Sequence, residues 1–379
     1  MQQCQDNFYE TFGSYLQILD CHQEQAKRSL WKRCSVRSLN VQPLDEDSPL
    51  INDVSAFAEG TTQDAIDDTV LGLGLAIRVD GELYPIRDTA YKSLLDRAKI
   101  SGSVLPKLSR KTLADVLNEC LHMFSSDALV LIRDEKVSAV HSGDVRDYSI
   151  LPVDELLTVL KKKLDERFPG GEFKEGYRDH SVTSATFIFP RQREELLETY
   201  ISLLEAKGQK TIADKLVPGI RFITSDTGVA SARVSAMIMG RQFPIRIGDC
   251  VAVDHRCQKK VEDFENSLDQ LFAQFSDNVK KLNELMSLEL DFPVNAMTRV
   301  CKKLAMPKKA AMEAIAMFEM ANGGASATAH DVFMAMQEIM FILKTQDTPK
   351  SKMLSVEENM ARALFIDWKS YDLAKGVDY

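Results

Sequence analysis

The spacing of apolar residues changes along the chain and predicts helices at both ends, with strands and helices mixed between them. Over residues 4–35, apolar side chains such as Phe8, Phe12 and Leu19 recur at helical intervals, which predicts one long helix. Residues 40–69 show no such period and are polar and acidic. We therefore expect a loop or a partner-facing segment there.

The middle of the chain alternates between short β-type runs and helical segments. Helices are expected at 88–100, at 153–168, at 194–206 and after an N-cap at Ser109. Strands are expected at 71–79, 82–86, 128–133, 137–142, 147–151, 172–178, 181–189, 219–225, 229–239 and 242–248. Because most of the turns between these runs are short, neighbouring strands should be antiparallel. The predicted fold class is therefore α+β, with a central antiparallel or mixed sheet.

The last third of the chain has apolar residues only at helical spacing. The expected helices cover 259–288, 294–304, 307–321, 328–344 and 355–368. Together these patterns predict three parts. They are an N-terminal helix with an acidic linker (1–69), an α+β sheet domain (70–257) and a helical C-terminal domain (258–379).

The composition is that of an ordinary globular protein. Of 379 residues, 45% are hydrophobic and 27% are charged, which excludes a disordered or collagenous chain. No apolar run approaches the roughly 18 residues of a membrane helix, and the N-terminus does not resemble a secretory signal. The seven cysteines are odd in number and widely spaced. This favours reduced thiols in a cytoplasmic protein with no membrane partner.

The acidic residues are unevenly distributed. The formal net charge is -9, and no Lys or Arg occurs between Arg37 and Arg78, where eight acids lie. The candidate partner-binding residues in this stretch are Asp45, Glu46, Asp47, Asp64, Asp67 and Asp68. Such a segment can imitate nucleic acid or dock on a basic host protein.

The clearest basic segment lies near the C-terminus. Between Val294 and Met312 there are five basic residues and no acid, on two expected helices joined by Ala305-Met306-Pro307. The basic residues are Arg299, Lys302, Lys303, Lys308 and Lys309. This pattern fits a helix-turn-helix, a non-specific phosphate contact or a helical hairpin with a solvated face. A second candidate set on the expected sheet comprises Arg221, Arg233, Arg241, Arg246 and Arg256.

Motifs for known chemistry are incomplete or missing. The chain has no phosphate-binding P-loop, no zinc-protease motif and no nucleophile elbow. Cys250, His255 and Cys257 supply at most half of a zinc site, and no cofactor or metal is expected. Asp154 with Glu172 and Lys174 loosely fits a metal-dependent nuclease. His141 and His180 lie beside turns, where acid–base chemistry competes with an ordinary structural role.

Three segments within residues 84–256 carry a family resemblance. They are PIRDTAYKSLLDRAKISGSVLPKL (85–108), LVLIRDEKVSAVHSGDVRDYSILPVDELL (129–157) and IRFITSDTGVASARVSAMIMGRQFPIRIGDCVAVDHR (220–256). As a set they resemble an uncharacterised phage and plasmid-like protein family, a domain of unknown function found on mobile elements. The resemblance implies a mobile-element origin and no particular activity.

These observations favour a protein that is not an enzyme. The leading hypothesis is binding of nucleic acid through its backbone, single-stranded or without sequence preference, in replication, recombination or maintenance of a mobile element. The alternative is a protein-interaction module that binds or inhibits a host factor through its acidic segment. A metal-dependent nuclease comes third, and an oligomer is compatible with each hypothesis.

Overall fold

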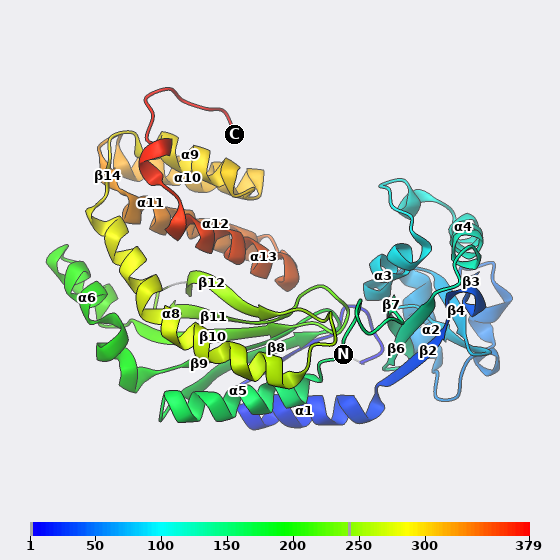
Figure 1. Cartoon of the computed structure of the whole chain (residues 1–379). Coiled ribbons are helices and arrows are strands. Elements are labelled where there is room, and N and C mark those ends of the chain that lie inside the picture. Colours follow the sequence, from blue (N-terminus) through cyan, green and yellow to red (C-terminus); the bar gives the residue numbers. More distant parts are fainter. Residues whose placement is uncertain (1–2, 242–243) are drawn as a thin grey trace.

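The computed structural model describes residues 3–241 and 244–379 and shows an α+β protein with two lobes (Figure 1). The small lobe comprises residues 30–142. The large lobe contains a sheet, the helices beneath it and a C-terminal helical arm, residues 289–379, that rises from one end of the sheet. The predicted fold class is thereby confirmed.

The large lobe is built on a wholly antiparallel sheet whose six described strands are β1 (Tyr9–Phe12), β8 (Glu172–Asp179), β9 (Thr183–Ile188), β10 (Val217–Thr224), β11 (Ala232–Met239) and β12 (Ile245–Val253), in that spatial order. β10 to β12 form a meander, as their short turns predict. Gly240 in one of these turns has φ +102, and a Cβ there would collide with the carbonyl of Lys215. The turn therefore requires glycine.

Helices cover one face of this sheet. They are α1 (Tyr15–Arg28), α5 (Val153–Arg167), α6 (Arg193–Ala206), α7 (Lys210–Ala213) and α8 (Val261–Ser287). Alternate strand residues such as Phe187, Phe222 and Val234 point toward them and are buried with Phe264 of α8 in the main core. The other face of the sheet carries polar and charged side chains instead.

The helical arm contains α9 (Pro293–Lys303), α10 (Lys308–Asn322), α11 (Ala329–Met336), α12 (Glu338–Thr345) and α13 (Lys350–Ala361), with a short pair β13 (Glu289–Leu290) and β14 (Ala327–Thr328) at its base. The helix expected at 328–344 is interrupted at Gln337. The helix expected at 355–368 instead begins at Lys350 and ends at Ala361, and two 3-10 turns follow, η6 (Arg362–Phe365) and η7 (Trp368–Tyr371).

The small lobe combines two three-stranded antiparallel sheets with three helices. One sheet contains β2 (Leu30–Ser35), β6 (Asp127–Arg133) and β7 (Lys136–Ser142); the other contains β3 (Asn40–Pro43), β4 (Leu75–Val79) and β5 (Glu82–Pro85). The helices are α2 (Gln63–Leu71), α3 (Asp88–Ala98) and α4 (Arg110–His122). Ser109 caps α4 as predicted, since its hydroxyl accepts the amide hydrogen of Thr112.

Three local predictions were wrong. The single helix expected at 4–35 is divided into β1, α1 and β2. The loop expected at 40–69 contains β3, α2 and two 3-10 turns, η2 (Pro49–Asn52) and η3 (Val54–Ala56), and it buries Leu44, Phe57 and Ile66 in a small core of its own. Residues 147–151 form no strand but connect the lobes, with Tyr148 buried. The first two residues of the strand expected at 242–248 lie outside the described residues.

The hydrophobic cores divide the chain differently from the expected boundaries at 69 and 257. One core joins buried residues between Cys34 and Val140. The main core joins Phe12 and Ile18 with residues from Leu151 to Trp368, so the sheet and the C-terminal helices share it. The two lobes are the physical units because each buries its own apolar surface.

In the described part of the chain, none of the helices combines the length and the apolar character needed to cross a membrane. The described cysteines form no disulfide bonds with one another.

Candidate nucleic-acid interface

The predicted lysines at the α9–α10 turn lie together on the surface. Lys302 and Lys303 end α9, and Lys308 and Lys309 begin α10, and all four are exposed. Lys302 Nζ donates to the backbone oxygen of Asp378, 2.6 Å away. Within the described residues, none of the four forms an ion pair with a carboxylate. We call these four residues the lysine apex.

Other lysine runs of the chain are neutralised by acids. On α5, Lys161, Lys162 and Lys163 pair with Asp165, Glu265 and Asp269. On α8 and just before it, Lys259, Lys280 and Lys281 pair with Asp263, Asp277 and Glu284. The lysine apex therefore differs from these runs in having positive charge that no neighbouring carboxylate compensates.

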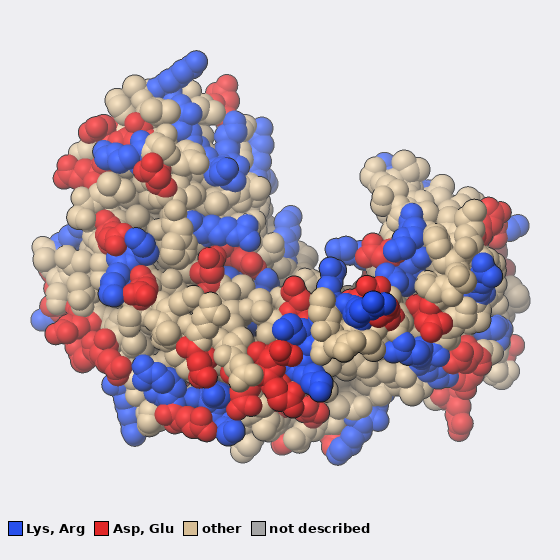
Figure 2. Space-filling view, viewed as in Figure 1, with Lys and Arg blue, Asp and Glu red and all other residues tan. Residues whose placement is uncertain are grey.

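The lysine apex belongs to an edge that faces the other lobe. Figure 2 shows a hollow between the two lobes, with Lys and Arg side chains along the side of the helical arm that borders it, over the ends of α9 and α10 and over α12 and α13. Further basic side chains lie across the hollow, over α3 of the small lobe. The remaining predicted residue of this segment, Arg299, is half-buried and donates to the backbone oxygen of Lys375.

Three of the predicted sheet arginines are not available to a nucleic acid. Arg221 is buried and holds both carboxylate oxygens of Glu357 at 2.7 Å. Arg233 pairs with Glu358, and Arg246 pairs with the same carboxylate at 3.7 Å. All three arginines point from the polar face of the sheet toward α13, which covers them. Their expected phosphate contacts are therefore incompatible with the fold.

The other two predicted arginines are in different places. Arg241 is half-buried beside Tyr200 and His330 and lines a pocket with Gln337 and Glu338 of the helical arm. Arg256 is exposed and lines a cavity between the lobes. Of the sheet set, Arg256 alone lines that cavity.

The inter-lobe cavity has a volume of ≈ 670 Å³ and is bounded by elements of both lobes. α3 and the end of β7 form one side; the β10–β11 turn and the residues after β12 form the other. Arg256 is joined there by Lys92 and Arg97 of α3 and by Lys99, the C-cap residue of that helix. These three residues form no continuous basic run, and intervals of five and two residues do not place all three on one helix face, so the sequence carries no signal that groups them.

Three aromatic rings stack beside this cavity. His141 and Tyr148 have ring centroids 3.6 Å apart and nearly parallel planes, and His255 stacks with Tyr148 at 5.5 Å. Trp31 flanks the stack, with its centroid 6.1 Å from that of His141 and 5.9 Å from that of Tyr148. His141 Nε2 and the Tyr148 hydroxyl both donate to the backbone oxygen of Asp226, at 2.8 and 2.9 Å. The Asp226 carboxylate binds Arg133 of the small lobe at 2.6 Å. The β10–β11 turn is thus fixed to the small lobe.

The stacked histidines are neutral at ordinary pH. Burial lowers the pKa of His141 to about 4, and the positive charges of its surroundings act in the same direction. Burial also lowers the pKa of His255. Because the Asp226 oxygen can only accept, His141 carries its proton on Nε2 and has a lone pair on Nδ1.

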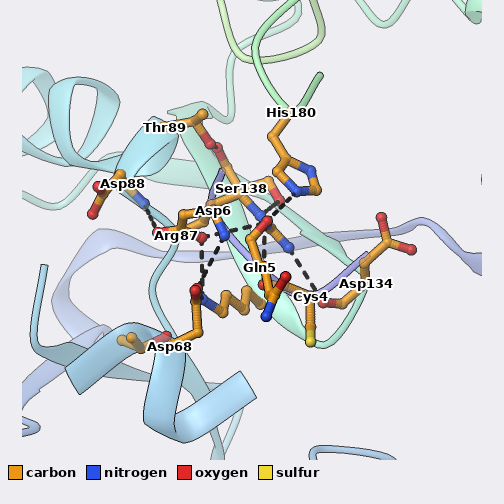
Figure 3. Close-up of polar contacts among 12 residues, drawn as sticks. Cys4, Gln5, Asp6, Asp68, Arg87, Asp88, Thr89, Asp134, Ser138 and His180 are labelled. Atoms are coloured by element: carbon orange, nitrogen blue, oxygen red, sulfur yellow. Dashed lines mark hydrogen bonds and ion pairs between the residues drawn. The ribbon is translucent and has the colours of Figure 1, made fainter. Parts of the chain in front are cut away.

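A buried charge cluster fastens the N-terminal segment between the lobes (Figure 3). Asp6 pairs with Arg87 at 3.2 Å and with Lys136 at 3.1 Å, and both cations have fully buried side chains. Asp68 pairs with Lys136 and accepts the backbone N–H of Asp6 at 3.0 Å. We call Asp6, Asp68, Arg87 and Lys136 the N-terminal clamp.

His180 of the large lobe completes the attachment of this segment. Its Nε2 donates to the backbone oxygen of Gln5, 2.9 Å away (Figure 3). Burial lowers the pKa of His180 to about 2. His180 and His141 form hydrogen bonds to different segments of the chain. Because the His180 ring holds the N-terminal segment in place, we assign it a structural role.

The acidic candidates are divided between structural and exposed positions. Asp68 belongs to the N-terminal clamp, and Asp67 accepts from Gln63 within α2. Glu46, Asp47, Asp64 and Asp67 are exposed, and Asp45 is half-exposed. The acidic segment therefore presents part of its charge to solvent from a folded surface.

The predicted nuclease and zinc groups are not assembled. Asp154 lies in the first turn of α5, whereas Glu172 and Lys174 follow its far end, and a 15-residue helix spans about 20 Å. Near the zinc candidates, His255 bonds to Ser149 and Thr224, while Cys257 is exposed. Among the described residues, no three His, Cys, Asp or Glu side chains are grouped so as to hold a metal.

Comparisons of this chain with protein-family models, with curated proteins and with solved structures found no match.

Proposed function

We propose that this protein binds nucleic acid through phosphate contacts in the hollow between its lobes. The observation that carries the proposal is the set of uncompensated cations facing this space: the lysine apex on one side, and Lys92, Arg97, Lys99 and Arg256 on the other. A protein with net charge -9 repels polyanions at long range, so binding has to come from a local surplus of this kind.

The chemistry of these groups favours backbone contact over sequence reading. Each apex lysine is a flexible point charge with three donors, which suits phosphate oxygens in varied positions. α10 continues beyond Lys309 with alanine and methionine residues, which carry few groups able to read base edges. We therefore propose binding with little sequence preference and with strong salt dependence.

The family resemblance of residues 84–256 suggests where such binding would serve. On a mobile element, a protein of this kind would act in replication, recombination or maintenance of the element, in the cytoplasm. The exposed acids Glu46, Asp47 and Asp64 support a second candidate, which is docking of a basic protein on the small lobe.

A matched pair of variants tests the leading proposal. The first replaces Lys302, Lys303, Lys308 and Lys309 by Gln; the control replaces Lys162, Lys259, Lys280 and Lys281, which are exposed but paired. Both change the net charge equally. Fluorescence anisotropy with single- and double-stranded DNA of two unrelated sequences should show weakened binding for the first variant only, to a similar extent on each sequence. Equal effects of the two variants, or no binding by the parent at low salt, would refute the proposal.

A further inference from the structure

The inter-lobe cavity has the size and the lining of a small-molecule site. The four residues of the lysine apex are not part of its lining. Its ≈ 670 Å³ falls within the range of about 300–1,000 Å³ common for such sites. It is lined by both lobes, which is a frequent position for a ligand. Polar groups dominate its surface, so a polar ligand is favoured over an apolar one.

The charges in the cavity favour an anion. Four cations line it, namely Lys92, Arg97, Lys99 and Arg256, and within the described residues none of them has an ion-pair partner. Three carboxylates also line it, from Asp96, Asp147 and Asp254. The Ser142 hydroxyl donates a hydrogen bond to the Asp147 carboxylate at 2.8 Å, so the segment that follows β7 orients this carboxylate.

Arg97 provides the sharpest indication. Its Nε is buried and has no hydrogen-bond partner among the described residues. A buried guanidinium N–H without an acceptor is costly, and native proteins rarely leave one unsatisfied. Arg97 and His141 both line the cavity, and the positive charge of Arg97 contributes to the lowered pKa of His141. An anion in the cavity would compensate the charge of Arg97, which has no ion-pair partner within the described residues.

His141, at the end of β7 and on the same side of the cavity as α3, offers a different kind of contact. The β10–β11 turn approaches His141 closely at Gly228, where φ is +79 and a Cβ would lie 3.4 Å from His141 Cε1 and 3.9 Å from Nδ1. Since His141 Nε2 donates to Asp226, its Nδ1 presents a lone pair on the Gly228 side. A neutral imidazole in this state accepts a hydrogen bond from a hydroxyl group. A ligand that suits the cavity therefore combines an anionic end with a hydroxyl.

We propose that the inter-lobe cavity binds a sugar phosphate group, with the phosphate monoester at Arg97 and neighbouring cations and a sugar hydroxyl at His141. This chemistry has two sources, a free nucleotide and the phosphorylated 5′ end of a nucleic-acid strand. The second source rests on the proposed function, whereas the first does not.

Calorimetry on the full chain tests the proposal with ribose 5-phosphate, uridine 5′-monophosphate and uridine. Both phosphates should bind with one-to-one stoichiometry and uridine should not. Arg97→Gln should weaken binding of the phosphates by tenfold or more, because a charge-assisted contact is lost. Lys107→Gln, which removes an exposed cation of the small lobe outside the cavity, should have no such effect. No binding at millimolar concentration, or equal binding by the Arg97→Gln variant with an unchanged melting temperature, would overturn the proposal.

Two further arms separate the sources and the two proposals. A 5′-phosphorylated oligonucleotide that binds the parent more tightly than its 5′-hydroxyl form, with no such preference in Arg97→Gln, identifies the strand end. Equal binding of the two oligonucleotides, with ribose 5-phosphate still bound, identifies the free nucleotide. The quadruple apex variant should retain ribose 5-phosphate binding, so that failure of the cavity proposal and failure of DNA binding by the apex are distinguishable.

Discussion

The N-terminal clamp predicts an unequal response to removal of its two acids. In Asp6→Asn, the fully buried Arg87 and Lys136 both lose a carboxylate, at 3.2 and 3.1 Å, and Arg87 keeps only neutral oxygen acceptors. In Asp68→Asn, Lys136 and Arg87 both keep their ion pairs with Asp6. Breaking a buried ion pair by removing one partner costs about 3–5 kcal/mol.

The loss of stability in Asp6→Asn should lie near the lower end of that range. The Asp6 side chain is 14% exposed, so water partly solvates the cations when the charge is lost. We expect Asp6→Asn to lower the free energy of unfolding by about 3 kcal/mol and Asp68→Asn by about 1–2 kcal/mol. Glu59→Gln, a change at an exposed acid of the same segment, should fall within about 0.5 kcal/mol of the parent.

Because the two lobes have separate cores, the assay has to report on each of them. Native-state hydrogen exchange read by mass spectrometry gives the opening free energy of β7 in the small lobe and of α8 in the large lobe separately. The loss should appear in β7. In a Lys136→Met background, the cost of Asp6→Asn should shrink by at least about 1 kcal/mol, since one of the two buried cations is gone. An Asp6→Asn variant with parental protection of β7 would refute this account of the clamp.

Two other predictions concern buried histidines and a buried ion pair. Burial lowers the pKa of His22 to about 3, of His141 to about 4 and of His180 to about 2, so below about pH 6.5 only the unfolded state takes up their protons. Stability should therefore be complete above pH 6.5 and fall by up to about 1.4 kcal/mol per pH unit for each histidine toward pH 4; urea unfolding that is flat from pH 7 to pH 5 would contradict this. Glu357→Gln leaves Arg221 buried with Glu175 at 3.9 Å as its remaining carboxylate, and should destabilise the large lobe by about 3 kcal/mol; α8 protection equal to that of an exposed-site control, Glu319→Gln, would show that the pair is dispensable.

Elements with a long, regular pattern could be predicted from the sequence. The helix expected at 259–288 is found as α8, Val261–Ser287, because Phe264, Leu268 and Leu271 repeat a single buried face. The β10–β12 meander was equally predictable, since its turns are too short for anything but neighbouring antiparallel strands.

Pairings between distant segments could not be predicted. β1 pairs with β8, where Tyr9 lies opposite Asp179, and this partner lies far along the chain from the N-terminal segment. Local apolar spacing at 4–35 looked helical throughout because nothing in that stretch reveals a distant sheet edge. The acidic stretch was misjudged for a similar reason, since Leu44, Phe57 and Ile66 form a core too small to impose a clear period.

The candidate sites show the same limit. The sequence does not reveal whether a basic residue on a strand is exposed or forms an ion pair. Arg221 forms one because α13 brings Glu357 back over the sheet. The lysine apex was predictable because all four residues are close in sequence and no acid lies among them. The inter-lobe cavity joins Lys92 with Arg256, which come together only in the folded chain.

The salt dependence of DNA binding tests the central claim most directly. For duplex DNA, the logarithm of the binding constant falls with the logarithm of salt concentration with a slope of about 0.9 per neutralised phosphate. If each apex lysine contacts one phosphate, replacing Lys302, Lys303, Lys308 and Lys309 by Gln should reduce the magnitude of the slope by about 3–4. The control with Lys162, Lys259, Lys280 and Lys281 replaced should keep the parental slope. Identical slopes for the parent and the apex variant, with both proteins folded, would contradict phosphate binding by the lysine apex.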